Sequence, residues 1–251
     1  MKKVLLPLLL LTLTACAPIQ EDTVVSSTPA TTYIAQDIYP NSTIHTLSHP
    51  FENVQGQERE LVETATVFLG HGYEPYLDNL QTEEVYLLKD YEPTIQEQTR
   101  VQADTSRYNW LNPLAVRRLG QDLAVSQQAE NELVSLHNEF VNETNNCQED
   151  IVSISNTVSH LASEHSLKLH SLYGDQEVTL SPNDLSNFIE RVRDIDIDTV
   201  LHVEGFPQRT TNQIGERANL DVTLVNPTLS EDYIESMKQL QQDIIPALNC
   251  E

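Results

Sequence analysis

The sequence predicts an α/β protein of two lobes with mainly parallel sheets, bridged by one long rigid backbone helix. Short apolar, β-branched runs alternate with helical patterns along most of the chain. This alternation is typical of βαβ units, whose strands are parallel. It is interrupted once, between Pro113 and Asn145, where apolar residues recur at helical spacing. A long helix between two alternating halves indicates two lobes with a stiff connection.

The first lobe is expected over residues 23–110. Runs rich in Val, Ile, Thr and Leu predict its strands, and the segments between them predict its helices. The expected strands are 23–27, 43–47, 66–69 and 85–88, and the expected helices are 29–39 and 74–80.

The backbone helix is expected over residues 111–146. Asn112 suits the N-cap position, and Pro113 suits the first helical position. The residues that recur at helical spacing are Leu119, Leu123, Leu133, Leu136 and Phe140. The pattern predicts one amphipathic helix of roughly 30 residues, about 45 Å long at 1.5 Å per residue.

Alternation resumes in the second lobe, residues 147–251. The expected strands are 151–154, 167–172, 199–203 and 222–225, and the expected helices are 157–165, 182–194, 211–218 and 231–248. Open α/β lobes bind ligands beyond the carboxyl ends of their strands. Residues that directly follow the strands, and the cleft between the lobes, are therefore the places to expect a site.

The chain begins MKKVLLPLLLLTLTAC, which predicts an export signal over residues 1–15. Two lysines precede an apolar run that is too short for a permanent membrane span. Leu13-Thr14-Ala15-Cys16 has the form of a lipobox, which favours lipidation of Cys16 over a plain secretory signal with an incidental cysteine. We expect residues 16–22 to form a lipidated tether, which would anchor the protein at the extracytoplasmic (periplasmic) face of a membrane in the cell envelope.

The formal net charge of −24 restricts the partners. Such an acidic chain repels nucleic acid and anionic lipid, so neither is expected as a partner. The sequence has no D-x-D-x-D-G calcium loop, and it has no GxSxG, HExxH or phosphate-loop motif. The missing motifs therefore count against an enzyme. We also expect the protein to be a monomer.

Cys147 and Cys250 are the cysteines that remain beyond Cys16. Two cysteines in an exported protein most often pair, which predicts a disulfide. The alternative, a pair that binds metal, has no CxxC spacing or clustered histidine to support it.

Several motifs, taken in order, resemble one family. They are the lipobox, "TLSHPFE", "VFLGHGYEPYLDNL", "NWLNPLAVRRLGQDLA", "LSPNDLSNFIERVRDIDIDTVLHVEG" and "LDVTLVNP". Together they resemble the zinc- and manganese-type (cluster A-I) solute-binding lipoproteins of bacterial ABC transporters, from about Thr23 to the C-terminus. The resemblance implies two α/β lobes with a metal ion held between them, which is passed to an ABC permease.

The resemblance also implies four metal-ligand positions, of which one keeps a strong donor. They fall on His49, Tyr108, Ser155 and Asn226. Zinc sites use three or four nitrogen, sulfur or anionic oxygen donors, whereas Tyr, Ser and Asn side chains are neutral at pH 7 and donate weakly. Weakened or altered binding of zinc or manganese, or none, is therefore expected. A neutral pocket around His49 could also suit a small polar organic ligand.

His71 and Glu204 each follow a predicted strand and are the substitute ligands to consider. Alternatively, His71 is an exposed turn residue between two glycines, and Glu204 is a structural carboxylate. The spacing of His160, His165 and His170 favours scattered histidines over a zinc cluster. The rival to a transport function is a surface lipoprotein that keeps the fold for interaction or structural roles and binds no metal.

Overall fold

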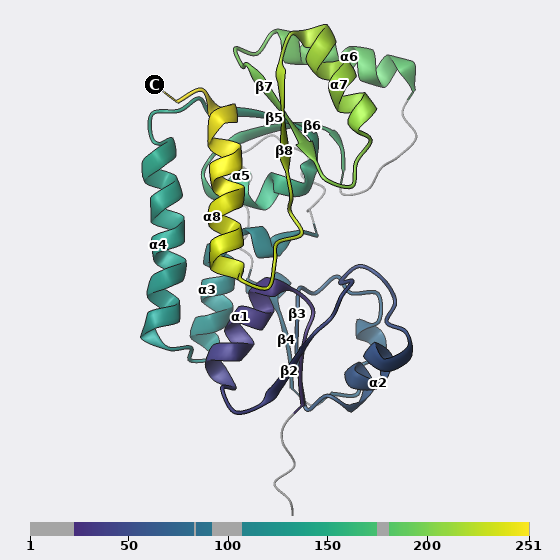
Figure 1. Cartoon of the computed structure of the whole chain (residues 1–251), viewed down its shortest axis with the longest axis vertical. Coiled ribbons are helices and arrows are strands. Elements are labelled where there is room, and N and C mark those ends of the chain that lie inside the picture. Colours follow the sequence, from purple (N-terminus) through teal and green to yellow (C-terminus); the bar gives the residue numbers. More distant parts are fainter. Residues whose placement is uncertain (1–22, 83, 92–106, 175–180, 251) are drawn as a thin grey trace, which may run out of the picture.

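The computed structural model describes residues 23–82, 84–91, 107–174 and 181–250 (Figure 1). The expected signal peptide, the 16–22 tether and Cys16 lie outside these residues. The molecule has two lobes arranged along its long axis, each with one sheet of four parallel strands (Figure 1). The two-lobe α/β fold with parallel sheets that the sequence predicts is therefore confirmed.

The first sheet has the order β2-β1-β3-β4. Its strands are β1 (Thr23–Ser26), β2 (Thr43–Thr46), β3 (Val67–Gly70) and β4 (Glu84–Leu87), and its helices are α1 (Pro29–Ile38) and α2 (Gly56–Thr64). The helix expected over 74–80 is wrong, because only the 3-10 turn η1 (Leu77–Asn79) forms there. The helix α2, which connects β2 to β3, is not among the helices that the sequence predicts.

The second sheet has the corresponding order β6-β5-β7-β8. Its strands are β5 (Asp150–Ser155), β6 (Lys168–Tyr173), β7 (Thr199–Val203) and β8 (Asp221–Val225). The helices of this lobe are α5 (Ser159–Glu164), α6 (Pro182–Arg193), α7 (Gln208–Ala218) and α8 (Tyr233–Ile244). Short 3-10 turns complete the chain at η2 (Leu88–Tyr91), η3 (Asn109–Leu111), η4 (Asn156–Val158) and η5 (Ile245–Leu248).

The expected single backbone helix is divided into α3 (Pro113–Asp122) and α4 (Gln127–Thr144), which corrects the prediction of one continuous helix over 111–146. Ala124 adopts a left-handed conformation with φ of 59°. The Val125 amide donates to the Gly120 carbonyl at 2.9 Å, which closes α3, and the Ser126 side chain caps α4. As a result α4 alone runs along the side of the molecule, next to α8 (Figure 1).

The two lobes share one hydrophobic core. A single cluster of buried side chains extends from Val24 on β1 to Val200 on β7. The Trp110 indole donates to the Pro227 carbonyl at 3.2 Å, and the buried Tyr233 hydroxyl donates to the Trp110 carbonyl at 2.9 Å. These contacts fix the orientation of one lobe relative to the other.

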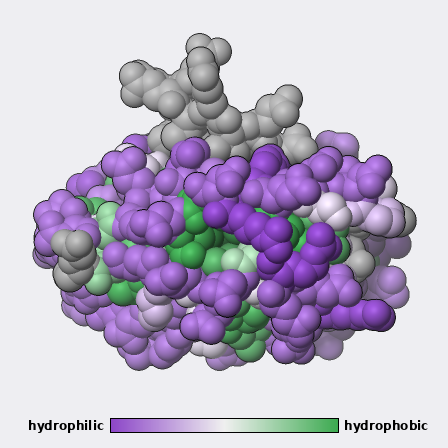
Figure 2. All heavy atoms as spheres, turned by 90° about the horizontal axis from the view of Figure 1, so that it is seen from above, coloured by the Kyte–Doolittle hydropathy of each residue, from purple (hydrophilic) through white to green (hydrophobic). Residues whose placement is uncertain are grey.

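A disulfide joins Cys147, just beyond α4, to Cys250, just beyond η5. The surface seen in Figure 2 is largely hydrophilic, with apolar residues in small patches, as the net charge of −24 leads one to expect. Within the described ranges, no helix has the length and apolar composition that a membrane span requires.

Candidate functional site

A pocket of about 590 Å³ lies between the lobes. The first lobe contributes the segments that follow β1 and β2, and the second lobe contributes residues 228–231, which follow β8. The pocket thus lies at the carboxyl ends of parallel strands, where α/β folds bind their ligands. Its volume is typical of sites for small molecules.

His49 and Tyr108 both line this pocket. His49 is exposed in the loop after β2, where its carbonyl accepts a hydrogen bond from the Glu52 amide at 3.2 Å. The pocket wall also carries exposed carboxylates, Glu52 and Glu231, and aromatic rings from Phe51 and Trp110. The structure therefore brings together two of the four positions that the family resemblance singles out.

The aromatic side of the pocket is a closely packed cluster of four rings, from Phe51, His71, Tyr108 and Trp110. The Phe51 ring centroid lies 5.1 Å from that of His71, 5.0 Å from that of Tyr108 and 5.4 Å from that of Trp110. The Arg107 guanidinium lies 4.4 Å above the Phe51 ring, a cation–π contact. Tyr108 is thus part of the packing of the pocket wall.

His71 is fully buried, so the expectation of an exposed turn residue is wrong. The Tyr73 amide donates to His71 Nδ1 at 3.3 Å, and His71 Nε2 then donates to the Pro50 carbonyl at 3.2 Å. Burial lowers the pKa of His71, although the nearby Glu74 carboxylate acts in the opposite direction. Both ring nitrogens are engaged with the backbone, so the neutral ring has a structural role and is not available to a metal ion.

Glu74 is a buried residue that the sequence reading missed. Its carboxylate accepts hydrogen bonds from the backbone amides of His71 at 2.6 Å and Gly72 at 2.7 Å, and from the Ser27 hydroxyl. The sequence Gly70-His71-Gly72-Tyr73-Glu74 carries the signal that could have indicated this turn: glycines flank His71, and a carboxylate follows it three residues later. The carboxylate holds the turn that positions His71 against the aromatic cluster.

The other expected ligand residues do not line the pocket. Ser155 is buried and bonds to the Thr157 hydroxyl at 2.8 Å. Asn226 is exposed, and its side-chain oxygen accepts from the Thr228 amide at 2.9 Å. Glu204 is exposed after β7. The structure therefore does not bring His71, Glu204, Ser155 or Asn226 together with His49 around this pocket.

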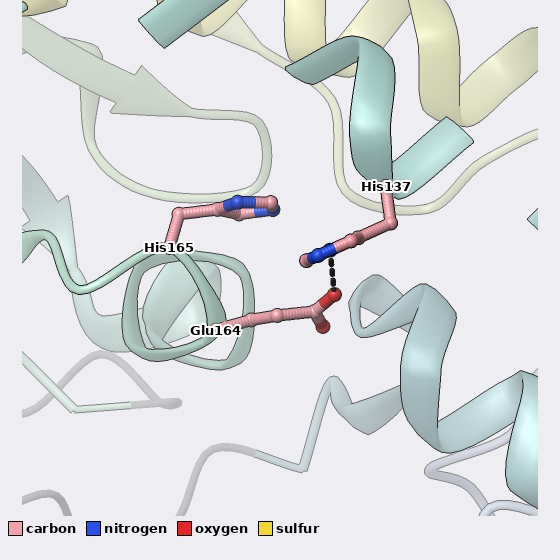
Figure 3. A group of neighbouring side chains, drawn as sticks. All are labelled: His137, Glu164 and His165. Atoms are coloured by element: carbon pink, nitrogen blue, oxygen red, sulfur yellow. Dashed lines mark ion pairs between the residues drawn. The ribbon is translucent and has the colours of Figure 1, made fainter. Parts of the chain in front are cut away.

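A different group of ligand residues does converge, away from the pocket. Among the described residues, His137, Glu164 and His165 are the set of three His, Cys, Asp or Glu side chains whose ligand atoms all lie within 4.8 Å of one another (Figure 3). The sequence predicts His165 to be a scattered histidine, on the spacing of His160, His165 and His170. His137, which is distant in sequence, is not part of that pattern. No such set forms around His49 within the described part of the chain.

No family model matches the sequence, and no curated protein matches it either. Solved structures do match. A zinc-bound ZnuA deletion mutant has a TM-score of 0.73 and 16% identity, over 92% of this chain and 99% of that one. A manganese-bound mutant of the periplasmic metal-binding protein of Candidatus Liberibacter asiaticus has a TM-score of 0.76 and 14% identity, over 91% and 100%. The laminin-binding protein Lmb of Streptococcus agalactiae has a TM-score of 0.74 and 13% identity, over 90% and 99%. The chain therefore has the two-lobe fold of the periplasmic zinc- and manganese-binding proteins, in agreement with the resemblance of its sequence motifs.

Proposed function

We propose that this protein is an extracytoplasmic solute-binding lipoprotein that works with an ABC permease, and that metal binding in its interlobe pocket is weakened or altered. The observation that carries the proposal is the composition of the pocket. His49 and Tyr108 line it, whereas Ser155 and Asn226 are engaged elsewhere in hydrogen bonds. The fold of a metal importer's binding protein is retained, and the ligand set is not.

The chemistry of the remaining donors supports weak binding. A zinc ion held tightly needs three or four donors at about 2.0 to 2.3 Å. His49 supplies one imidazole, and the Tyr108 phenol is a poor donor while it is protonated. The pocket volume of about 590 Å³ is large for a bare ion. Hydroxyl, carboxylate and aromatic groups around such a space suit a small polar solute or a hydrated ion.

The second candidate is a surface lipoprotein that keeps the fold for interaction and binds no metal. The observation in its favour is that one structural neighbour, Lmb, is described as a protein with adhesin as well as metal-transporting activity. If this second candidate is correct, the loss of metal donors would not impair transport, because the protein would have no transport function. The two candidates differ in whether the interlobe pocket binds a solute at all.

Calorimetric titration of the purified protein with zinc and with manganese tests the proposal. The titration is made with the His165→Ala variant, so that metal binding by the group of His137, Glu164 and His165 (Figure 3) does not add to the measured heat. We expect weak binding, with a Kd in the range of roughly 10 µM to 1 mM, that is lost in His49→Ala. The matched control is His45→Ala, because His45 lies on β2 and does not line the pocket.

Two results would count against the proposal in different ways. Nanomolar binding that depends on His49 would show that the metal site is not weakened. No His49-dependent binding of either metal at millimolar concentration, together with no enrichment of a small solute by the protein, would favour the surface lipoprotein.

A further inference from the structure

His137, Glu164 and His165 come from two separate parts of the chain. His137 lies on α4, Glu164 is the last residue of α5, and His165 follows it directly. Figure 3 shows the three side chains pointing toward one another across the space between these helices. His137 Nδ1 lies 2.6 Å from Glu164 Oε1, and the two imidazole rings are stacked with centroids 5.0 Å apart.

The polar atoms of this group lack partners to an unusual degree. The Glu164 side chain is 3% exposed, and neither of its oxygens makes a well-formed hydrogen bond. Both ring nitrogens of His165, and Nδ1 of His137, are also buried without one. Buried polar atoms in folded proteins are nearly always satisfied. Even when His137 Nδ1 is paired with Glu164 Oε1, both ring nitrogens of His165 remain buried without a partner, which indicates that a further group belongs there.

An ion pair between Glu164 and a protonated His137 does not account for the whole group. It would use one nitrogen and one oxygen, and it would leave both nitrogens of His165 without a partner. Burial raises the pKa of Glu164, although His137, the Leu114 backbone and Arg118 favour its ionised form. Burial and the charge of His137 lower the pKa of His165 to about 3. His165 is therefore a neutral imidazole with a free lone pair, which is the form that binds metals.

We propose that His137, Glu164 and His165 form a binding site for a divalent transition-metal ion, with zinc as the best fit. Two imidazole nitrogens and one carboxylate oxygen are a common zinc ligand set, and they leave a fourth position open for water. Tetrahedral zinc with ligands at about 2.0 to 2.1 Å holds its ligand atoms roughly 3.4 Å apart. The present ligand atoms all lie within 4.8 Å of one another, so small side-chain movements suffice to close the site.

This site is separate from the interlobe pocket, and a metal ion bound here would affect the stability of the protein. None of the three residues lines that pocket. Because His137 belongs to α4 and the other two ligands belong to the second lobe, the ion would cross-link α4 to α5. The His137 side chain is 20% exposed, which gives an ion a route from solvent. Zinc at this position would stabilise the lobe arrangement whether or not the interlobe pocket is filled.

Competition between the chelator-treated protein and a chromophoric zinc chelator tests the site. We expect one zinc ion per chain with an affinity that falls about 100-fold or more in His165→Ala and in Glu164→Gln. Glu164→Gln keeps the size of the side chain, so it tests the charge without a cavity. The control variants His45→Ala and His170→Ala should bind zinc as the unmodified protein does, because neither residue belongs to this group or lines the interlobe pocket. Zinc at about 100 times its Kd should also raise the Tm by roughly 5 to 10 °C, and only where the three ligands are intact.

Three outcomes would overturn the proposal of this metal site. They are no zinc binding at about millimolar concentration, binding that both ligand variants retain, and binding that His49→Ala alone abolishes. The last outcome would place the ion in the interlobe pocket and so support the proposed function while removing this site. Circular dichroism of each variant confirms that a loss of binding is not a loss of fold.

Discussion

Glu74 shows how much one buried side chain contributes to the turn after β3. Its carboxylate accepts from two backbone amides, those of His71 and Gly72, and from the Ser27 hydroxyl. Hydrogen bonds to a charged acceptor are among the stronger ones in proteins. Removal of the acceptor leaves the buried Gly72 amide unsatisfied, whereas the His71 amide keeps the Ser27 hydroxyl at 3.1 Å as an acceptor. An orphaned buried amide costs more than its hydrogen bond contributes.

Glu74→Ala should lower the free energy of unfolding by about 2 kcal/mol, because the orphaned Gly72 amide costs about 1 to 3 kcal/mol. Glu74→Gln should cost less, since its amide oxygen still accepts from the backbone. Urea unfolding measures both values. The exposed Glu216 on α7 provides the control, and Glu216→Ala should change stability by less than about 0.5 kcal/mol. Equal effects at Glu74 and Glu216 would contradict the role assigned to Glu74.

His71 should make the stability of the protein depend on pH. Its pKa is lowered in the folded state by burial, whereas the unfolded chain takes up a proton near pH 6.5. Between the folded pKa and 6.5 the unfolded state binds more protons, so stability falls as the pH falls through this window. A single group contributes at most about 1.4 kcal/mol per pH unit.

Comparison with His71→Gln isolates this contribution, because glutamine keeps a donor and an acceptor but does not titrate. Between about pH 7.5 and 5.5, the unmodified protein should lose more stability than the variant, measured by urea unfolding at each pH. Parallel pH profiles for the two proteins would show that His71 titrates alike in the folded and unfolded chain.

The sequence predicts part of the residue-level site. The motif positions are sufficient to place His49 and Tyr108 at one pocket, where His49 follows β2 and Tyr108 directly precedes the 3-10 turn η3. They do not show that His71 is buried, because Phe51 and Trp110, which cover it, come from other segments. The sequence does not reveal the group of His137, Glu164 and His165 for the same reason. Its members come from α4 and α5 and meet only in the folded protein.

At the scale of single elements, the break between α3 and α4 is the main difference between the predicted and the observed helices. Leu123 and Leu133 are ten residues apart, which turns a helix through about 1000° and leaves the two side chains roughly 80° out of phase. Ser126 is a suitable N-cap residue, which is a second indication that a new helix begins there. The strands and the helices with proline at their start were easier to predict, because their patterns are short and local. The helix α2 was missed because only Val62 of its residues is buried.

Ala124→Gly should stabilise the break. Ala124 has a φ of 59°, a conformation that costs an alanine about 1 to 2 kcal/mol and costs glycine little. After the extra flexibility of the unfolded glycine chain is subtracted, the free energy of unfolding should rise by about 0.5 to 1 kcal/mol. Ala129→Gly, inside α4, should have the opposite effect, so a loss of stability from both substitutions would contradict the left-handed turn.

At the scale of the whole molecule, the disulfide closes a loop that contains the entire second sheet. Cys147 precedes β5 and Cys250 follows η5, with a separation of 103 residues. A cross-link over a loop of this length restricts the unfolded chain by an amount worth up to about 4.7 kcal/mol in the loop-entropy model. The bond lies away from the interlobe pocket, so it acts on stability rather than on the site.

Replacement of both cysteines, as Cys147→Ser with Cys250→Ser, should therefore lower the Tm by several degrees and leave the affinity of the interlobe pocket unchanged. Differential scanning calorimetry measures the first effect. It should also show one transition, because both lobes belong to a single core. An unchanged Tm would count against the bond, and two separate transitions would count against the shared core.

The matching strand orders of the two sheets, β2-β1-β3-β4 and β6-β5-β7-β8, bear on the origin of the chain. In both sheets the first strand lies second from one edge and ends at a serine, Ser26 or Ser155, with a threonine two residues further on. Duplication of one ancestral four-stranded unit would produce this arrangement without any exchange of strands. Divergence of the two halves after such a duplication would remove any repeat from the sequence. In such a history the interlobe pocket would descend from the contact between two once-identical halves, and differences between its walls would have accumulated later.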